Sequence, residues 1–191
     1  MTKDTVTTPH DTPAEIALLP RDLLTDPEEQ QAILEILTEC DEDFCPPLSY
    51  RGGTSEKQLG HAHPNTDGVQ SYYQEILQQS AILAKRGEEI IGFLSYRPSY
   101  RCAALEQFGE VCYMTTLCLR HSERGKGLSP AIYEAAEQRI RQRFPGRVIT
   151  FRTWSTNQAQ MHLTEKLGYR CVAVLKDDRG QGIDTMYFVK P

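Results

Sequence analysis

The sequence predicts a single domain of the α/β (α+β) class, with a mixed central sheet of about six to seven strands and helices on both faces. The chain has 191 residues, enough for one full core and too few for two typical domains. Hydrophobic periodicity gives the element order β-α-α-β-β-β-α-β-α-β-β. A glycine loop between a strand and a helix is the third observation, because such a loop can hold a phosphate where the helix begins.

The first eighty residues are predicted to contain an edge strand, two helices and a long loop. The apolar run at 15–19 is the strand. Asp26 followed by Pro27 has the form of an N-cap and a first helical proline, and it opens a helix that ends before the loop at 40–65. The apolar spacing at 68–78 predicts the second helix.

The remainder of the chain is predicted to begin with a hairpin and then to alternate strands with helices. The helices are expected at 130–143 and from about Asn157 to Gly168, where glycine can end a helix. The expected strands are 81–84, 89–96, 110–119, 148–154, 170–175 and 184–189.

The segment Leu117–Ser129 runs from an apolar strand through a short glycine loop into a helix. Gly125 and Gly127 remove two Cβ atoms where the backbone must approach a ligand closely or adopt positive φ. Backbone N–H groups at the start of a helix bind anions, and Arg124 and Lys126 add positive charge beside them. The loop therefore predicts a phosphate site, and more specifically a pyrophosphate site.

Two common phosphate-binding patterns do not fit this loop. In a P-loop the lysine follows its glycine, whereas Lys126 precedes Gly127, and no glycine lies five residues before Gly125. The dinucleotide fingerprint requires a third glycine where this chain has Pro130. A nucleotide-binding domain is thus an interpretation that holds only if the loop is considered alone.

A second motif lies downstream of the glycine loop. The strand at 148–154 is followed by Asn157 and a short helix that closes in the run Glu165–Tyr169. This arrangement resembles motif B of the GNAT superfamily of acyl-CoA N-acyltransferases, and the loop at Arg124–Leu128 resembles its motif A. The two motifs occur in the family's order, and the resemblance covers roughly residues 81–191.

The resemblance implies an N-acetyltransferase that moves an acetyl group from acetyl-CoA to a primary amine by direct attack. The strands at 110–119 and 148–154 would splay apart to form the cofactor cleft. A flexible tail at 1–13 would precede the transferase domain at 14–191. Residues 14–80 would lie on the acceptor side, facing a small-molecule or peptide amine, and residues 81–191 would form the cofactor-binding core. The implied cofactor contacts are the main-chain groups of Leu117 and Leu119, the loop residues Arg124, Gly125, Lys126, Gly127, Leu128 and Ser129, and Asn157.

Two positions depart from the family pattern. Ser122 stands where a Gln or Arg is usual, and Thr164 stands where many members carry a Tyr that acts as general acid. The second departure supports the alternative of a non-catalytic acyl-CoA-binding regulatory module. Glu110 and Tyr113 are the candidates for the base that accepts the amine proton. Their offset is odd, so at most one of them faces the acceptor directly.

Charge is divided unevenly along the chain. Residues 1–85 hold fifteen acidic and five basic side chains, and residues 86–191 hold eleven and sixteen. The basic half coincides with the motifs that would face the anionic cofactor. The acidic half favours a cationic amine acceptor or, equally, is a solvated surface. No long basic stripe with interleaved aromatic residues is present, so a nucleic-acid partner is not expected.

Neither a metal site nor a membrane segment is expected. The six cysteines include no Cys-x-x-Cys pair, and His61 and His63 form a lone His-x-His in a loop. No apolar run approaches the twenty residues that a membrane span needs. Residues 1–13 lack the basic region and apolar core of a signal peptide, so a cytoplasmic protein is expected. The sequence indicates neither the oligomeric state nor the identity of the amine.

Overall fold

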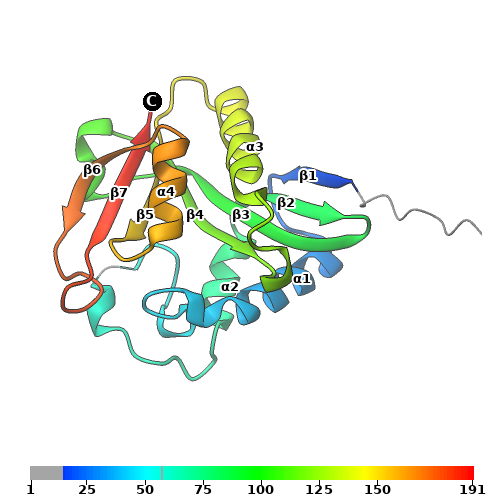
Figure 1. Cartoon of the computed structure of the whole chain (residues 1–191), viewed down its shortest axis with the longest axis horizontal. Coiled ribbons are helices and arrows are strands. Elements are labelled where there is room, and N and C mark those ends of the chain that lie inside the picture. Colours follow the sequence, from blue (N-terminus) through cyan, green and yellow to red (C-terminus); the bar gives the residue numbers. More distant parts are fainter. Residues whose placement is uncertain (1–14, 57) are drawn as a thin grey trace, which may run out of the picture.

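The computed structural model describes residues 15–56 and 58–191, so the tail predicted at 1–13 lies outside the described residues. It contains one seven-stranded mixed sheet with helices on both faces (Figure 1). No helix in these ranges combines the length and the apolar character needed to cross a bilayer. The strands are β1 (Ile16–Arg21), β2 (Ser80–Arg86), β3 (Glu89–Tyr100), β4 (Val111–Leu119), β5 (Ile149–Trp154), β6 (Arg170–Leu175) and β7 (Thr185–Lys190). The helices are α1 (Pro27–Glu39), α2 (Gln70–Leu77), α3 (Leu128–Arg143) and α4 (Gln158–Lys166).

The predicted order of helices and strands is confirmed, and the helix caps explain two of the boundaries. The Asp26 carboxylate accepts hydrogen bonds from the N–H groups of Glu28 and Glu29 at 2.8 and 3.4 Å, as expected for an N-cap. α3 begins at Leu128, two residues before its predicted start, because Gly127 is its N-cap.

The sheet has the strand order β1-β2-β3-β4-β5-β7-β6. Strands β1 to β4 form an antiparallel meander, β4 and β5 are parallel, and β7 lies between β5 and β6 in antiparallel pairing. The predicted edge strand is confirmed, since β1 lies at one end of the sheet. Pro20, within β1, is tolerated there because an edge strand does not need every N–H group for pairing.

Each face of the sheet has its own core. Ile132 and Ile140 of α3 pack with Ile149 of β5 on one face, together with partly buried residues of α4. Ile33 of α1 and Tyr72 of α2 belong to the cluster on the other face, beneath β2 and β3. The sheet is therefore the middle of three layers, and a ligand that passes between two strands can reach both outer layers.

β4 and β5 separate soon after they begin. They share only two register pairs, Cys112 with Ile149 and Tyr113 with Thr150. Just beyond that point β4 has a bulge, because Met114 pairs with Tyr96 and Thr116 pairs with Ser95, which leaves Thr115 as the extra residue. The predicted splay of these two strands is confirmed, and it opens a gap in the centre of the sheet.

Candidate active site

A cleft of about 510 Å³ lies where β4 and β5 diverge. Its walls come from both strands, from α3 and α4, and from the end of α1 with the loop that follows it. Six of the expected cofactor residues line this cleft: Leu117, Leu119, Arg124, Gly125, Ser129 and Asn157. Lys126, Gly127 and Leu128 lie in the same loop and at the start of α3.

The backbone of β4 presents alternate residues to the cleft. Arg120 donates its N–H to the carbonyl of Ile91 in β3 at 2.9 Å, so the residues on either side of that position point the other way. Leu117 and Leu119 thus direct their main-chain groups away from β3, toward the gap left by β5. The Leu119 carbonyl accepts hydrogen bonds there from the Arg124 guanidinium at 3.3 Å and the Cys40 thiol at 3.4 Å.

The glycine loop has the conformation that its sequence predicts. Gly125 and Gly127 have φ of +73° and +76°, in the region that side chains other than glycine rarely adopt. A Cβ atom added to either glycine would meet no atom within 4 Å, so the loop borders open space. Gly127 provides no side-chain cap to α3, and Leu128 and Ser129 therefore keep helix-start N–H groups for an external acceptor.

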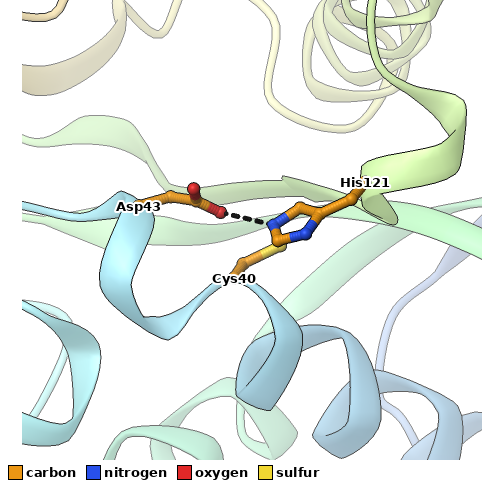
Figure 2. A group of neighbouring side chains, drawn as sticks. All are labelled: Cys40, Asp43 and His121. Atoms are coloured by element: carbon orange, nitrogen blue, oxygen red, sulfur yellow. Dashed lines mark hydrogen bonds and ion pairs between the residues drawn. The ribbon is translucent and has the colours of Figure 1, made fainter.

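Arg124 is held at the outer end of the cleft by a small cluster that includes Cys40, Asp43 and His121, the three side chains drawn in Figure 2. Its Nη2 lies 2.5 Å from Asp43 Oδ2 and 3.2 Å from Cys40 Sγ, and His121 Nε2 lies 3.0 Å from the same carboxylate oxygen. The hydrogen bond from Arg124 holds the pKa of Asp43 below its usual value. Cys40, Asp43 and His121 are close enough to share a metal ion, but the guanidinium already supplies a cation between two of them.

The side chain of Asn157 is partly committed to the start of α4. Its Oδ1 accepts from the Gln160 N–H at 3.1 Å, and its Nδ2 donates to Thr153 Oγ1 at 3.2 Å. This N-cap fixes the first turn of α4 against β5, opposite the wall formed by β4. Asn157 therefore shapes the cleft as well as lining it.

The structure does not bring Glu110 and Tyr113, the two expected base candidates, to the cleft wall. Glu110 precedes β4 and pairs with Arg147 at 2.6 Å. Tyr113 is 1% exposed and stacks on Tyr100 with ring centroids 4.4 Å apart. A half-buried ion-paired carboxylate and a packed phenol cannot be told from catalytic groups in the sequence, because the strand pattern does not show what lies opposite each side chain. Neither residue lines the cleft, and their assignment as base candidates stays a prediction.

Thr164, at the position of the family's tyrosine, is also withdrawn from the cleft. It is 1% exposed, and its hydroxyl donates to the carbonyl of Gln160 at 2.7 Å, one turn back in α4. A short hydroxyl committed to its own helix does not reach a departing thiolate. The buried position of Thr164 thus agrees with its departure from the family's tyrosine in the sequence.

Tyr133, which the sequence did not single out, lines the cleft from α3. Its hydroxyl accepts a hydrogen bond from Gln160 Nε2 at 2.9 Å, so this bond leaves the phenolic proton free to be donated elsewhere. Burial raises the pKa of Tyr133, and the phenol stays neutral at ordinary pH. The helical spacing of α3 gave no signal for this role, since Tyr133 falls among its core-facing residues.

Comparison with known proteins identifies the family. A sequence model described as the acetyltransferase (GNAT) family matches residues 33–169, which is more than half of the chain. The chain therefore belongs to the GNAT family of acetyltransferases. The predicted family is confirmed, and with it the predicted class of enzyme, a GNAT-type N-acetyltransferase. No curated protein matches the chain by sequence.

Solved structures share the fold at low sequence identity. A GNAT-family structure from Desulfovibrio desulfuricans aligns with a TM-score of 0.66 at 14% identity, covering 92% of this chain and 98% of the other. NAA60 of Arabidopsis thaliana, in complex with a bisubstrate analogue, gives 0.61 at 16% identity, covering 91% and 97%. The yncA protein of Salmonella typhimurium, solved with its cofactor acetyl-CoA, gives 0.59 at 16% identity, covering 91% and 93%. These similarities confirm the predicted fold class.

Proposed function

We propose that this chain transfers the acetyl group of acetyl-CoA to a primary amine by direct attack, without an acyl-enzyme. The observation that carries the proposal is the cleft between β4 and β5, which joins a glycine-capped helix start to the centre of the sheet. An extended molecule such as acetyl-CoA matches both features, because its thioester arm fits the gap between the strands and its anionic end fits the start of α3. The acceptor is a small molecule or a peptide, and it approaches from the side of residues 14–80. The expected cytoplasmic location stays a prediction.

The outer end of the cleft fits the diphosphate of acetyl-CoA. The N–H groups of Leu128 and Ser129 lie at the positive end of α3 without a side-chain cap, and Gly125 and Gly127, which border open space, put no side chain in the way. The pantetheine would then lie along the edge of β4 that Leu117 and Leu119 present. Residues 81–191 would thereby supply the whole cofactor site.

In the transfer step the amine nitrogen forms a bond to the thioester carbon, and the carbon–sulfur bond breaks. Asp43 is the carboxylate that lines the described part of the cleft, and Arg124 and His121 hold it at the outer end. We therefore assign the amine proton to solvent. The neutral phenol of Tyr133 donates a hydrogen bond to the departing sulfur, which leaves as the thiol of coenzyme A after protonation.

A thermal melt and a thiol-release assay together test the proposal. A ligand at about 100 times its dissociation constant adds about 2.7 kcal/mol to the stability of the folded state. We expect acetyl-CoA, but neither ATP nor NAD, to raise the melting temperature. Release of free thiol with a panel of amines would then show transfer. A melting shift without thiol release for any amine would favour the non-catalytic acyl-CoA-binding module, and no shift would exclude both.

A further inference from the structure

Three arginines gather at the inner end of the cleft, on the side away from α3 and α4. Arg51 comes from the loop after α1, Arg152 from β5, and Arg179 from the connection between β6 and β7. Arg51 and Arg179 are 5% and 6% exposed. Three distant segments of the chain thus place positive charge in the interior at one point.

The hydrogen-bond partners of these arginines are neutral. Arg152 Nη2 donates to a backbone carbonyl at 2.7 Å, Arg51 Nη2 to another at 2.6 Å, and Arg179 Nε to a hydroxyl at 2.9 Å. In the described ranges, none of the three forms an ion pair within 4.0 Å with a carboxylate. The accepting groups are the carbonyls of Cys45, Pro46, Thr54 and Glu56 and the hydroxyl of Thr185.

Buried charge without a counter-charge is costly, and Arg51 and Arg179 show the consequence, whereas the tyrosines around Arg152, Tyr113 first, raise the pKa of Arg152 against the effect of burial. Burial, and then the repulsion from Arg51 and Arg152, lowers the pKa of Arg179 to about 9. Burial likewise lowers the pKa of Arg51. The carboxylate of Asp178 is reached only through the hydroxyl of Thr185, which donates to it at 2.5 Å. The site therefore lacks a negative charge in direct contact.

Arg152 is the member of this cluster that lines the cleft. It lies two residues beyond Thr150, the last residue of β5 that pairs with β4, and so stands just past the point where the strands divide. The rings of Phe44 and Trp154 also line the cleft, 6.0 Å apart. Arg51 packs over Phe44 and Arg179 over Trp154, so these two arginines stand behind the rings.

We infer that the acceptor is a free α-amino acid, whose carboxylate pairs with Arg152 while its amine faces the thioester. This inference rests on the proposed acetyl transfer and specifies its substrate class. A planar carboxylate matches a guanidinium, and the positive field of Arg51 and Arg179 strengthens the attraction. The rings of Phe44 and Trp154 leave an apolar wall for the amino-acid side chain. A cationic amine, which the acidic half of the sequence favoured, and a peptide N-terminus would each leave Arg152 without a counter-charge.

Matched acceptors test the inference. We would measure kcat/KM for acetyl transfer to L-leucine, L-phenylalanine and L-methionine, each beside its carboxamide and its decarboxylated amine, and to dipeptides that begin with the same residues. A charge-assisted hydrogen bond is worth about 1.5–3 kcal/mol, or about 10- to 100-fold. We expect the free amino acids to exceed their carboxamides by at least that factor. The corresponding aminoalkylphosphonates are measured as well, so that selectivity for a carboxylate can be told from selectivity for any anionic group.

The variant R152Q identifies the residue responsible. It should lower kcat/KM for the preferred amino acid by about 100-fold, and leave the rate with the carboxamide and the KM for acetyl-CoA nearly unchanged. R152K, which keeps the charge, should retain part of the preference. R147Q is the matched control, because Arg147 pairs with Glu110 outside the cleft. The three variants should melt within a few degrees of the native protein.

Calorimetry makes the result independent of turnover. The preferred amino acid, titrated into the protein saturated with coenzyme A, should bind the native chain and R147Q but not R152Q. If no acceptor releases thiol, the proposed acetyl transfer fails, and these titrations still decide whether a carboxylate binds at Arg152. Equal or faster transfer to carboxamides, decarboxylated amines, dipeptides or phosphonates would overturn the inference and leave acetyl transfer standing. An R152Q variant with unchanged preference and binding would overturn it as well.

Discussion

The two ends of the cleft use arginine in opposite ways. At the outer end Arg124 is paired with Asp43 at 2.5 Å, and Arg120 lies within 4.0 Å of three glutamates, namely Glu35, Glu39 and Glu89. At the inner end Arg152 and its two neighbours contact neutral oxygens only. The outer arginines are thus balanced within the chain and connect α1 to the glycine loop, whereas the inner ones leave room for an anion that the chain does not supply.

The two ends also differ in their access to water. The side chains of Arg124 and Asp43 are each 40% exposed. Near the inner end Tyr72 and Tyr113 are each 1% exposed, and the Tyr72 hydroxyl lies 2.7 Å from that of Thr116. Charge–charge contacts are therefore screened at the outer end and much stronger at the inner end.

The largest effect is expected where the two ends meet, at Tyr133. Y133F removes the only O–H donor of this side chain but keeps the ring, so kcat should fall by about 100-fold while the affinity for acetyl-CoA stays the same. Steady-state kinetics with calorimetry of acetyl-CoA checks this. Y169F is the matched control, because Tyr169 is also buried but its hydroxyl donates to Glu137 at 2.8 Å. Equal losses in the two variants would mean that Tyr133 acts through packing.

A smaller loss is expected at the glycine loop, and it should affect the outer end alone. G127A forces a side chain into positive φ and puts a Cβ atom where the diphosphate would lie, so acetyl-CoA should bind about 10- to 100-fold more weakly. G146A imposes comparable strain at φ +78° beyond the end of α3. If both variants lose equal stability and only G127A loses affinity, the loop binds the cofactor. Unchanged affinity in G127A would contradict that assignment.

Titration to alkaline pH tests how far tyrosines, including those near the inner end of the cleft, are buried. Eight tyrosines have a pKa raised by burial, so they stay protonated in the folded chain when the unfolded chain loses its phenolic protons near pH 10. The folded state then binds more protons, and the free energy of unfolding should fall as the pH rises from about 10 toward 12, by up to about 1.4 kcal/mol per pKa unit of each shift. Arg179, with its lowered pKa, opposes this in the same range. The tyrosines are Tyr72, Tyr73, Tyr96, Tyr100, Tyr113, Tyr133, Tyr169 and Tyr187.

Phenolate absorbance checks this prediction. All nine tyrosines should titrate together in urea, whereas most should resist ionisation in the folded protein until it unfolds. Urea denaturation at pH 8 and pH 10.5 measures the accompanying loss of stability. Full titration of the native protein near pH 10 would show that the inner end is open to water.

The smallest effect is expected at the outer ion pair. D43N removes a carboxylate that competes with phosphate for Arg124, so acetyl-CoA should bind a few-fold more tightly, since an exposed pair is worth about 0.2–1 kcal/mol. R124Q should weaken binding instead. Titrations at low and high salt check both variants, and the difference should shrink as salt rises. Tighter binding by R124Q would show that this arginine does not face the cofactor.

The sequence predicted the parts of this protein that local rules govern. The N-cap of α1, the positive φ of Gly125 and Gly127, and Gly168 just after the end of α4 all follow from residues close together in the chain. Apolar periodicity placed every strand, with errors of a few residues at the ends. The strand divergence followed from the resemblance to the family rather than from any pattern in the strands.

The parts that the sequence did not reveal depend on contacts between distant segments. The sequence proposed Glu110 as a base candidate but could not show that Arg147 pairs with it. The arginine cluster joins residues 51, 152 and 179, and nothing in their local sequences shows that they meet. Arg152 did carry one visible signal, since it is a charged residue in the middle of an otherwise apolar and β-branched strand. A charged residue in such a strand is expected to have a partner of opposite charge. Only the tertiary structure shows that no carboxylate in the described residues pairs with it.

The two register pairs between β4 and β5 make that junction the weakest seam of the sheet. Strands β1 to β4 and strands β5 to β7 form two antiparallel ladders, each interrupted by irregularities in register, and the chain crosses from one to the other once, through α3. A cut in the turn at Gly146 would divide the chain between these two ladders, which are otherwise joined by the core that α3 shares with β5 and β7. Acetyl-CoA, which would contact both ladders, would hold the two parts of the chain together when it binds.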